Sequence, residues 1–209
     1  MDDHGHGTAT AGVIASNHTT RRGMSPGADL LALKVLDSTG WGYFSNVIAG
    51  INWCIANKNL YNISVISMSL GTVGLTYTPS TSPGYIDPAL QAAYNLNIAS
   101  VASSGNEGST TEMSYPAVSP YVISVGSSYN TNLGTMTLPM GNSTCTDTVI
   151  NPDMMSCFSN RAPFLDLIAP GCNILTAYNF GGFVPECGTS MAAPHVSGTI
   201  ALMKQRNPQ

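Results

Sequence analysis

The feature that most constrains the fold of this chain is a series of short apolar runs, at residues 29–36, 65–70, 98–103, 122–127 and 165–169. Each run is continuously hydrophobic and does not alternate with polar residues. This pattern is typical of strands that are covered on both faces. The runs therefore predict the strands of a mostly parallel sheet with helices on both sides.

Helical patterns separate these runs. Between the first two, apolar residues recur every three to four positions, at Phe44, Val47, Ile48, Ile51, Cys54 and Ile55, with Ser45 as the candidate N-cap. Before the third run, Asp87 and Pro88 fit the cap and first residue of a second helix. The alternation of strand and helix predicts an α/β fold with right-handed crossovers.

The composition limits the classes of partner. Only 9% of the 209 residues are charged, the net charge is −4, and the longest basic run is Arg21-Arg22. Such a chain lacks the positive charge that nucleic-acid binding requires. Its apolar stretches are also far shorter than the roughly 20 residues of a membrane-spanning helix. We expect a single monomeric domain over residues 1–209 that binds neither nucleic acid nor membrane.

Two segments depart from the strand and helix alternation. Residues 128–156 have no clear period, and we interpret them as a surface insertion within the domain. Residues 172–187 are typical of a β-hairpin that turns around residues 179–181. A turn centred between Asn179 and Phe180 places Cys172 opposite Cys187.

The five cysteines contain no CxxC pair and no Cys/His spacing suited to zinc. The hairpin register predicts a disulfide between Cys172 and Cys187, and Cys145 and Cys157 can pair likewise near the insertion. Cys54 falls on the apolar face of its helix and is expected to be a buried free thiol. The alternative is that all five cysteines are reduced.

Three segments carry candidate catalytic residues, and each also has a purely structural interpretation. His6 begins HGTATAG, where a near-neutral imidazole can act as a general base or serve only the structure. Asn106 in SSGNEG follows a predicted strand, so its amide is either an oxyanion donor or a turn residue. Ser190 in GTSMAAPHVSG is at a predicted helix start, where it is either a nucleophile or a plain N-cap. Capping alone does not explain Pro194 and His195.

Taken in this order, HGTATAG, ASSGNEG and GTSMAAPH resemble the subtilisin-like serine proteases, or subtilases, and GMSPGADLLALKVL, SMSLG, YPAVSPYVISVG and LIAPG extend the similarity. The resemblance implies a three-layer α/β fold and a serine endopeptidase that forms an acyl-enzyme. It assigns Ser190 as nucleophile, His6 as general base and Asn106 as oxyanion donor. It also implies polypeptide substrates, a propeptide as a further partner, and an extracellular or cell-envelope location.

The resemblance also implies a binding site for an extended peptide. The peptide lies between one segment with Gly40 and Gly42 and another with Ser69, Leu70 and Gly71, while Ser103, Ser104 and Gly105 line the pocket for the residue before the cut. These side chains are small and uncharged. We therefore expect a roomy, uncharged pocket that prefers large apolar or aromatic residues.

One catalytic residue of the family has no match. The family carries its catalytic aspartate at the end of an early strand before the histidine, whereas Asp2 and Asp3 match the acidic loop that directly precedes it. We expect a fragment truncated at both ends, without the first strand or strands and the C-terminal elements. Loss of this aspartate in subtilisin costs about 3 × 10⁴ in turnover. We therefore expect this chain to be nearly inactive without it.

No cofactor or metal is expected. Calcium is common in the family, but the loop at residues 15–25 is short and carries two arginines. A metal site at Asp2, Asp3, His4 and His6 would place adjacent ligands on a terminus, which disfavours a preorganised cage. We expect His195 to be structural and to pack behind Ser190.

Two alternative functions are considered. The first is a catalytically silent fragment, or pseudo-protease, that binds peptides by strand addition along the cleft. The second is an esterase with a nucleophile elbow. The esterase lacks support, because no GxSxG surrounds a candidate serine.

Overall fold

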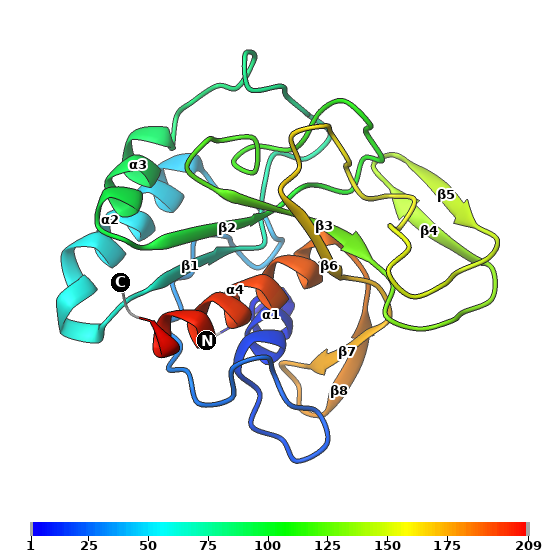
Figure 1. Cartoon of the computed structure of the whole chain (residues 1–209), viewed down its shortest axis with the longest axis horizontal. Coiled ribbons are helices and arrows are strands. Elements are labelled where there is room, and N and C mark those ends of the chain that lie inside the picture. The colour runs from blue at the N-terminus through cyan, green and yellow to red at the C-terminus, as the bar shows by residue number, and fades with distance from the viewer. Residues whose placement is uncertain (1, 208–209) are drawn as a thin grey trace.

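The computed structural model describes residues 2–207 and contains a four-stranded parallel sheet (Figure 1). Its strands, in spatial order, are β1 (Val65–Met68), β2 (Ala99–Ser103), β3 (Ile123–Ser128) and β6 (Leu167–Pro170). Four of the five apolar runs therefore form the predicted parallel strands. Because the strands are parallel, their carboxyl ends meet at one edge of the sheet.

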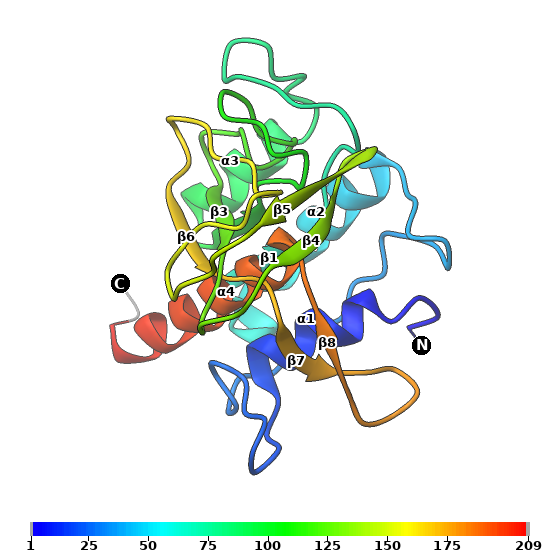
Figure 2. The same ribbon diagram turned by 90° about the vertical axis from the view of Figure 1, so that its right-hand side faces the viewer.

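Helices cover both faces of this sheet, as predicted. They are α1 (His6–Ala15), α2 (Phe44–Tyr61), α3 (Asp87–Asn95) and α4 (Thr189–Arg206). One buried cluster joins α2 and α3 to the sheet through residues such as Ile51, Leu90 and Ile66. A second joins α4 to the other face through Ala193, Val196 and Val125. Figure 2 shows α1 and α4 on one side of the sheet and α2 and α3 on the other.

The helix starts differ slightly from the predictions. Helix α2 begins at Phe44 with Tyr43 as its N-cap, so Ser45 lies in the first turn and does not cap it. Helix α3 has Ile86 as its N-cap, and Asp87 and Pro88 are its first two residues. Proline fits there because the N–H groups of a first turn have no partner within the helix.

The predicted strand at residues 29–36 is wrong, because these residues pair with no strand. They line a cavity that separates them from β1, the edge strand of the sheet, and Leu30, Leu31 and Leu33 are exposed. An apolar run reports that a segment favours burial, but a strand also needs a neighbouring backbone about 4.8 Å away. That neighbour is absent among residues 2–207.

The hairpin before α4 is confirmed, but its register is shifted by one residue. Strand β7 (Ile174–Ala177) pairs with β8 (Phe183–Glu186), and Ile174 faces Glu186. Asn173 adopts a left-handed conformation with φ of 58°, which ends the regular ladder beside Cys172. Cys172 nevertheless forms the predicted disulfide with Cys187, with the two Cα atoms 4.0 Å apart.

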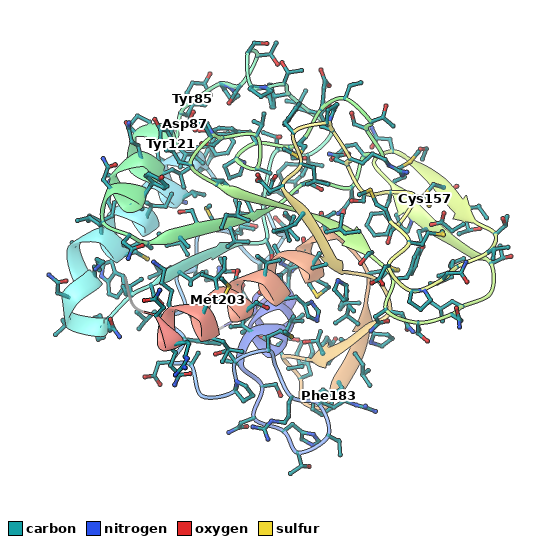
Figure 3. All side chains as sticks on the ribbon, viewed as in Figure 1. Tyr85, Asp87, Tyr121, Cys157, Phe183 and Met203 are labelled. Atoms are coloured by element: carbon teal, nitrogen blue, oxygen red, sulfur yellow. A yellow bond between two sulfur atoms is a disulfide. The ribbon has the colours of Figure 1, made fainter. Side chains whose placement is uncertain are left out.

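Residues 129–156 contain a second hairpin that the sequence analysis did not find. Strand β4 (Met136–Met140) pairs with β5 (Ser143–Asp147) over a small apolar cluster that includes Tyr129, Leu138 and Phe158. The predicted disulfide between Cys145 and Cys157 is confirmed, and Figure 3 shows Cys157 beside these two strands. Cys54 is a buried free thiol, as predicted.

The Cys172–Cys187 bridge gives a test of this architecture. Replacing both cysteines by serine should lower the free energy of unfolding by about 3 kcal/mol, because the bridge closes a 15-residue loop in the unfolded chain. Urea denaturation followed by circular dichroism measures the change. Cys54→Ala, which removes a buried thiol but no crosslink, serves as the control. A loss no larger than that of the control would contradict a stabilising bridge.

Candidate active site

His6 is the first residue of α1, and Asp2 fixes the start of that helix. The Asp2 carboxylate accepts hydrogen bonds from the Thr8 backbone N–H and hydroxyl, both at 2.7 Å, and from the Gly5 N–H at 2.9 Å. Burial alone would raise the pKa of Asp2, but these bonds and one from the His4 N–H hold the pKa well below its usual range. Asp2 therefore acts as an ionised cap on the helix that carries His6.

His6 is held in its neutral form. Burial lowers the pKa of its imidazole below 6.5, and the nearby His4 lowers it further, whereas the charge of Asp2 opposes both. At neutral pH the ring can therefore accept a proton. Within residues 2–207 no carboxylate is hydrogen-bonded to the His6 ring. Asp2 is nearby, but its oxygens are occupied by the α1 cap.

Ser190 is the second residue of α4, where backbone N–H groups have no partner within the helix. Its carbonyl would normally accept the N–H of residue 194, but Pro194 has no N–H. The hydroxyl of Ser69 donates to the Ser190 carbonyl instead, at 2.7 Å. Because Pro194 donates no N–H, the Ser190 carbonyl can accept the Ser69 hydroxyl. This contact joins the segment after β1 to the serine.

Asn106 follows β2 and is oriented by Thr189, the residue before Ser190. Its side-chain oxygen accepts the Thr189 N–H at 3.0 Å and the Thr189 hydroxyl at 2.8 Å. With the oxygen fixed in this way, the Asn106 amide N–H₂ remains available as a donor. The Asn106 amide group lies close to Gly188, immediately before the serine helix.

These residues line one cavity of about 2200 Å³, which also extends between residues 29–36 and β1. Among the residues predicted to form the site, those that line it are His6, Gly40, Gly42, Ser69, Leu70, Gly71, Ser103, Gly105, Asn106 and Ser190. Ser104 is the exception. Its side chain is fully buried and donates to the Asn160 carbonyl at 3.0 Å, so it supports the pocket from behind.

The pocket is not free of charge, which corrects the sequence-based expectation. The Glu107 carboxylate lies directly beside Gly105, where it accepts bonds from the Asn160 amide at 2.7 Å and the Ser114 hydroxyl at 3.2 Å. Asn160 also accepts the backbone N–H of Ser109 at 2.9 Å. Sequence reasoning missed Asn160, because nothing near it signals a contact with a segment more than fifty residues earlier.

The structure also shows the surroundings of His195 and the grouping of possible metal ligands. His195 is partly buried on α4 with its Nδ1 atom 2.8 Å from the Met191 carbonyl, as expected for a structural histidine. Burial lowers its pKa. Residues 2–207 contain no group of three or more His, Cys, Asp or Glu side chains placed to hold a metal ion.

The sheet, its two helical layers and the residues at its carboxyl edge have the arrangement of a subtilisin-like α/β protein. Comparison with protein families matches residues 1–209 to the Subtilase family. The chain therefore belongs to the subtilase family.

Individual relatives agree. Subtilisin amylosacchariticus from Bacillus subtilis subsp. amylosacchariticus is 37% identical over 213 residues, which cover all of this chain and 48% of that protein. Subtilisin-like protease 1 from Trichophyton equinum is 38% identical over 205 residues, covering 97% of this chain and 34% of that protein. The chain thus spans half or less of the length of these two relatives. The solved structure of Sphericase has a TM-score of 0.77 and 27% identity, covering all of this chain and 66% of that one.

The contact between Ser69 and Ser190 can be tested with a double-mutant cycle. Ser69→Ala should lower the free energy of unfolding by about 1 to 3 kcal/mol, because the Ser190 carbonyl loses its donor. In a Pro194→Ala background the cost should be smaller, since the new N–H supplies that donor. Urea denaturation of the four proteins gives the coupling energy. Thr199→Ala, whose hydroxyl bonds another α4 carbonyl, should be additive with Pro194→Ala. If the effects of Ser69→Ala and Pro194→Ala are also additive, Ser69 does not replace the missing N–H of residue 194.

The protonation of His6 gives a second test. NMR titration should give a pKa for His6 below 6.5, and Asp2→Asn should lower it further by removing a nearby negative charge. Asp3→Asn, which removes a carboxylate paired with Lys34, is the matched control. Since the unfolded histidine titrates near 6.5, this group's share of the stability is complete above pH 6.5 and is lost as pH falls through the lowered pKa. A pKa above 6.5 would contradict this description.

Proposed function

We propose that this protein is a serine endopeptidase that cleaves polypeptides through an acyl-enzyme on Ser190. The observation that supports this most is the orientation of Asn106 by Thr189, the residue next to Ser190. A plain turn asparagine would not need its oxygen fixed by two bonds at the start of a distant helix. With that oxygen held, the amide can donate to charge that develops beside Ser190.

In the proposed mechanism the Ser190 hydroxyl oxygen attacks the carbonyl carbon of the scissile peptide bond, and its proton passes to the neutral ring of His6. The carbonyl oxygen becomes an oxyanion that accepts hydrogen bonds from the Asn106 amide and the Ser190 backbone N–H. The C–N bond then breaks, and His6 gives its proton to the leaving amine. A water molecule, deprotonated by His6, then attacks the acyl carbonyl carbon, the bond from that carbon to the Ser190 oxygen breaks, and His6 returns the proton to the Ser190 oxygen.

The proposed substrates are extended polypeptides, bound between the segments of Gly40–Gly42 and Ser69–Gly71. The pocket of Ser103 and Gly105 receives the residue before the cut, and Ser104 supports it from behind. The carboxylate of Glu107 gives this pocket a polar side, so a lysine is accommodated there as well as an apolar residue. We propose that the protein acts as a monomer without a cofactor.

We also propose an extracellular location. A relative 31% identical over 209 residues is named minor extracellular protease Epr, from Bacillus subtilis, and the match covers 99% of this chain and 27% of that protein. The two disulfides fit an oxidising environment. Independently of this proposal, the helices described in residues 2–207 include none with the length and hydrophobicity of a membrane span.

A second candidate function is binding without cleavage. It is favoured by the absence of a carboxylate bonded to the His6 ring within residues 2–207, because such a group normally orients the imidazole of a serine protease. On this alternative the cleft holds peptides but Ser190 is not acylated. The two functions differ in whether a covalent adduct forms.

A fluorophosphonate probe separates the two candidates. We expect the probe to form an adduct on Ser190, detected by mass spectrometry of the intact chain and its peptides, and Ser190→Ala to abolish it. Asn106→Ala should slow the formation of this adduct by about 10² to 10³, the usual cost of removing one oxyanion donor. Ser109→Ala, near the same loop but outside the site, is the control. Labelling elsewhere, or none, would favour binding without cleavage.

A further inference from the structure

We propose that the β4–β5 hairpin forms the wall of the cleft that binds the leaving-group side of the substrate, and that it selects an apolar residue there. This inference rests on the proposed endopeptidase function and deepens it. It concerns residues that the sequence analysis treated only as a surface insertion.

The tip of the hairpin is attached to the turn that carries Asn106. The backbone N–H of Gly141, between β4 and β5, donates to the Asn106 carbonyl at 3.0 Å. Beside it the Met140 sulfur occupies the space that a side chain at Gly108 would need. The Gly108 N–H donates to the Phe158 carbonyl at 2.7 Å. Hairpin, Phe158 and oxyanion turn are therefore one connected structure.

The hairpin lines the same cavity as the proposed acyl-binding segments, and its tip at Gly141 lies against Glu107, next to Asn106. Gly71 packs against Ser114 and the Tyr115 carbonyl, so the Ser69–Gly71 segment covers one side of the pocket. Leu138, Pro139, Gly141 and Phe158 line the same cavity beyond the turn. On this proposal, a peptide that runs from Ser69–Gly71 past Ser190 meets the hairpin next.

The chemistry of the hairpin favours an apolar ligand. Residues 133–146 carry no charged side chain. Leu138 is buried beneath the hairpin, whereas Pro139 is exposed and lines the cavity. A charged residue of the substrate would lose water against this wall without gaining a partner. An apolar residue would instead remove apolar surface from water.

The hairpin is also held firmly enough to act as a wall. The Cys145–Cys157 disulfide ties β5 to the residue before Phe158. The Asp147 carboxylate accepts the Cys157 N–H at 2.9 Å and the Tyr129 hydroxyl at 2.7 Å. A wall fixed in this way loses little conformational entropy when a peptide binds.

Peptide binding to the Ser190→Ala protein tests the inference without turnover. Two fluorescent peptides share an acyl part that ends in phenylalanine. One ends there as an amide, and the other continues with Leu-Ala. Fluorescence anisotropy should show that the extension strengthens binding about fivefold or more. Adding Pro139→Glu should cancel this gain, and so should Asp in place of Leu in the peptide bound to the unaltered hairpin. Thr137→Glu, on the same strand but not lining the cavity, should preserve it.

The outcomes separate this inference from the proposed function. If neither peptide binds, the proposed function fails and this inference fails with it. If the short peptide binds but the extension adds nothing, or adds equally with Pro139→Glu, only the role of the hairpin is wrong. The Asp-containing peptide requires no change to the hairpin, so its result stands even if Pro139→Glu fails to fold. Equal binding of the Leu and Asp extensions would overturn the proposed preference.

Discussion

The contact on which the site depends joins the end of β2 to the start of α4. Asn106 accepts two hydrogen bonds from Thr189, which lies 83 residues later in the chain. This contact fixes the direction of the Asn106 amide relative to Ser190. The parallel sheet makes the contact geometrically available, because the carboxyl end of β2 and the start of α4 meet at the same edge. Without it, the serine and the amide would be separate features of two loops.

At α1, hydrogen bonding and burial give separate roles to Asp2 and His6. Asp2 accepts the N–H groups of Gly5 and Thr8 at the start of the helix, and its ionisation is stabilised by those bonds and not by a counter-charge. Because its oxygens are occupied, Asp2 influences His6 only through space. Burial is the larger effect on the imidazole, and it keeps His6 neutral at the pH where a base is useful. The roles of cap and base are thus divided between two residues four positions apart.

Much of this could be predicted from the sequence, and the failures have identifiable causes. Continuous apolar runs indicated four strands correctly, because strands between two helical layers have no polar face. The same rule failed at residues 29–36, since hydrophobicity does not reveal whether a neighbouring backbone is present. The hairpin register was wrong by one residue because the loop holds five residues, 178–182, and is therefore centred on Phe180. Strands β4 and β5 were missed, since β5 is polar apart from Cys145 and Pro139 interrupts β4.

Candidate site residues were easier to predict than their supports. His6, Asn106 and Ser190 lie in short local motifs, whereas Asn160 and the place of Glu107 in the pocket depend on contacts distant in sequence. Such contacts have a consequence for how the protein forms. Ser69 reaches Ser190 across 121 residues, and Thr176 reaches Ala9 across 167. Contacts this distant in sequence can form only after long loops of the chain have closed. The site is therefore complete only when both ends of the chain are in place on the sheet.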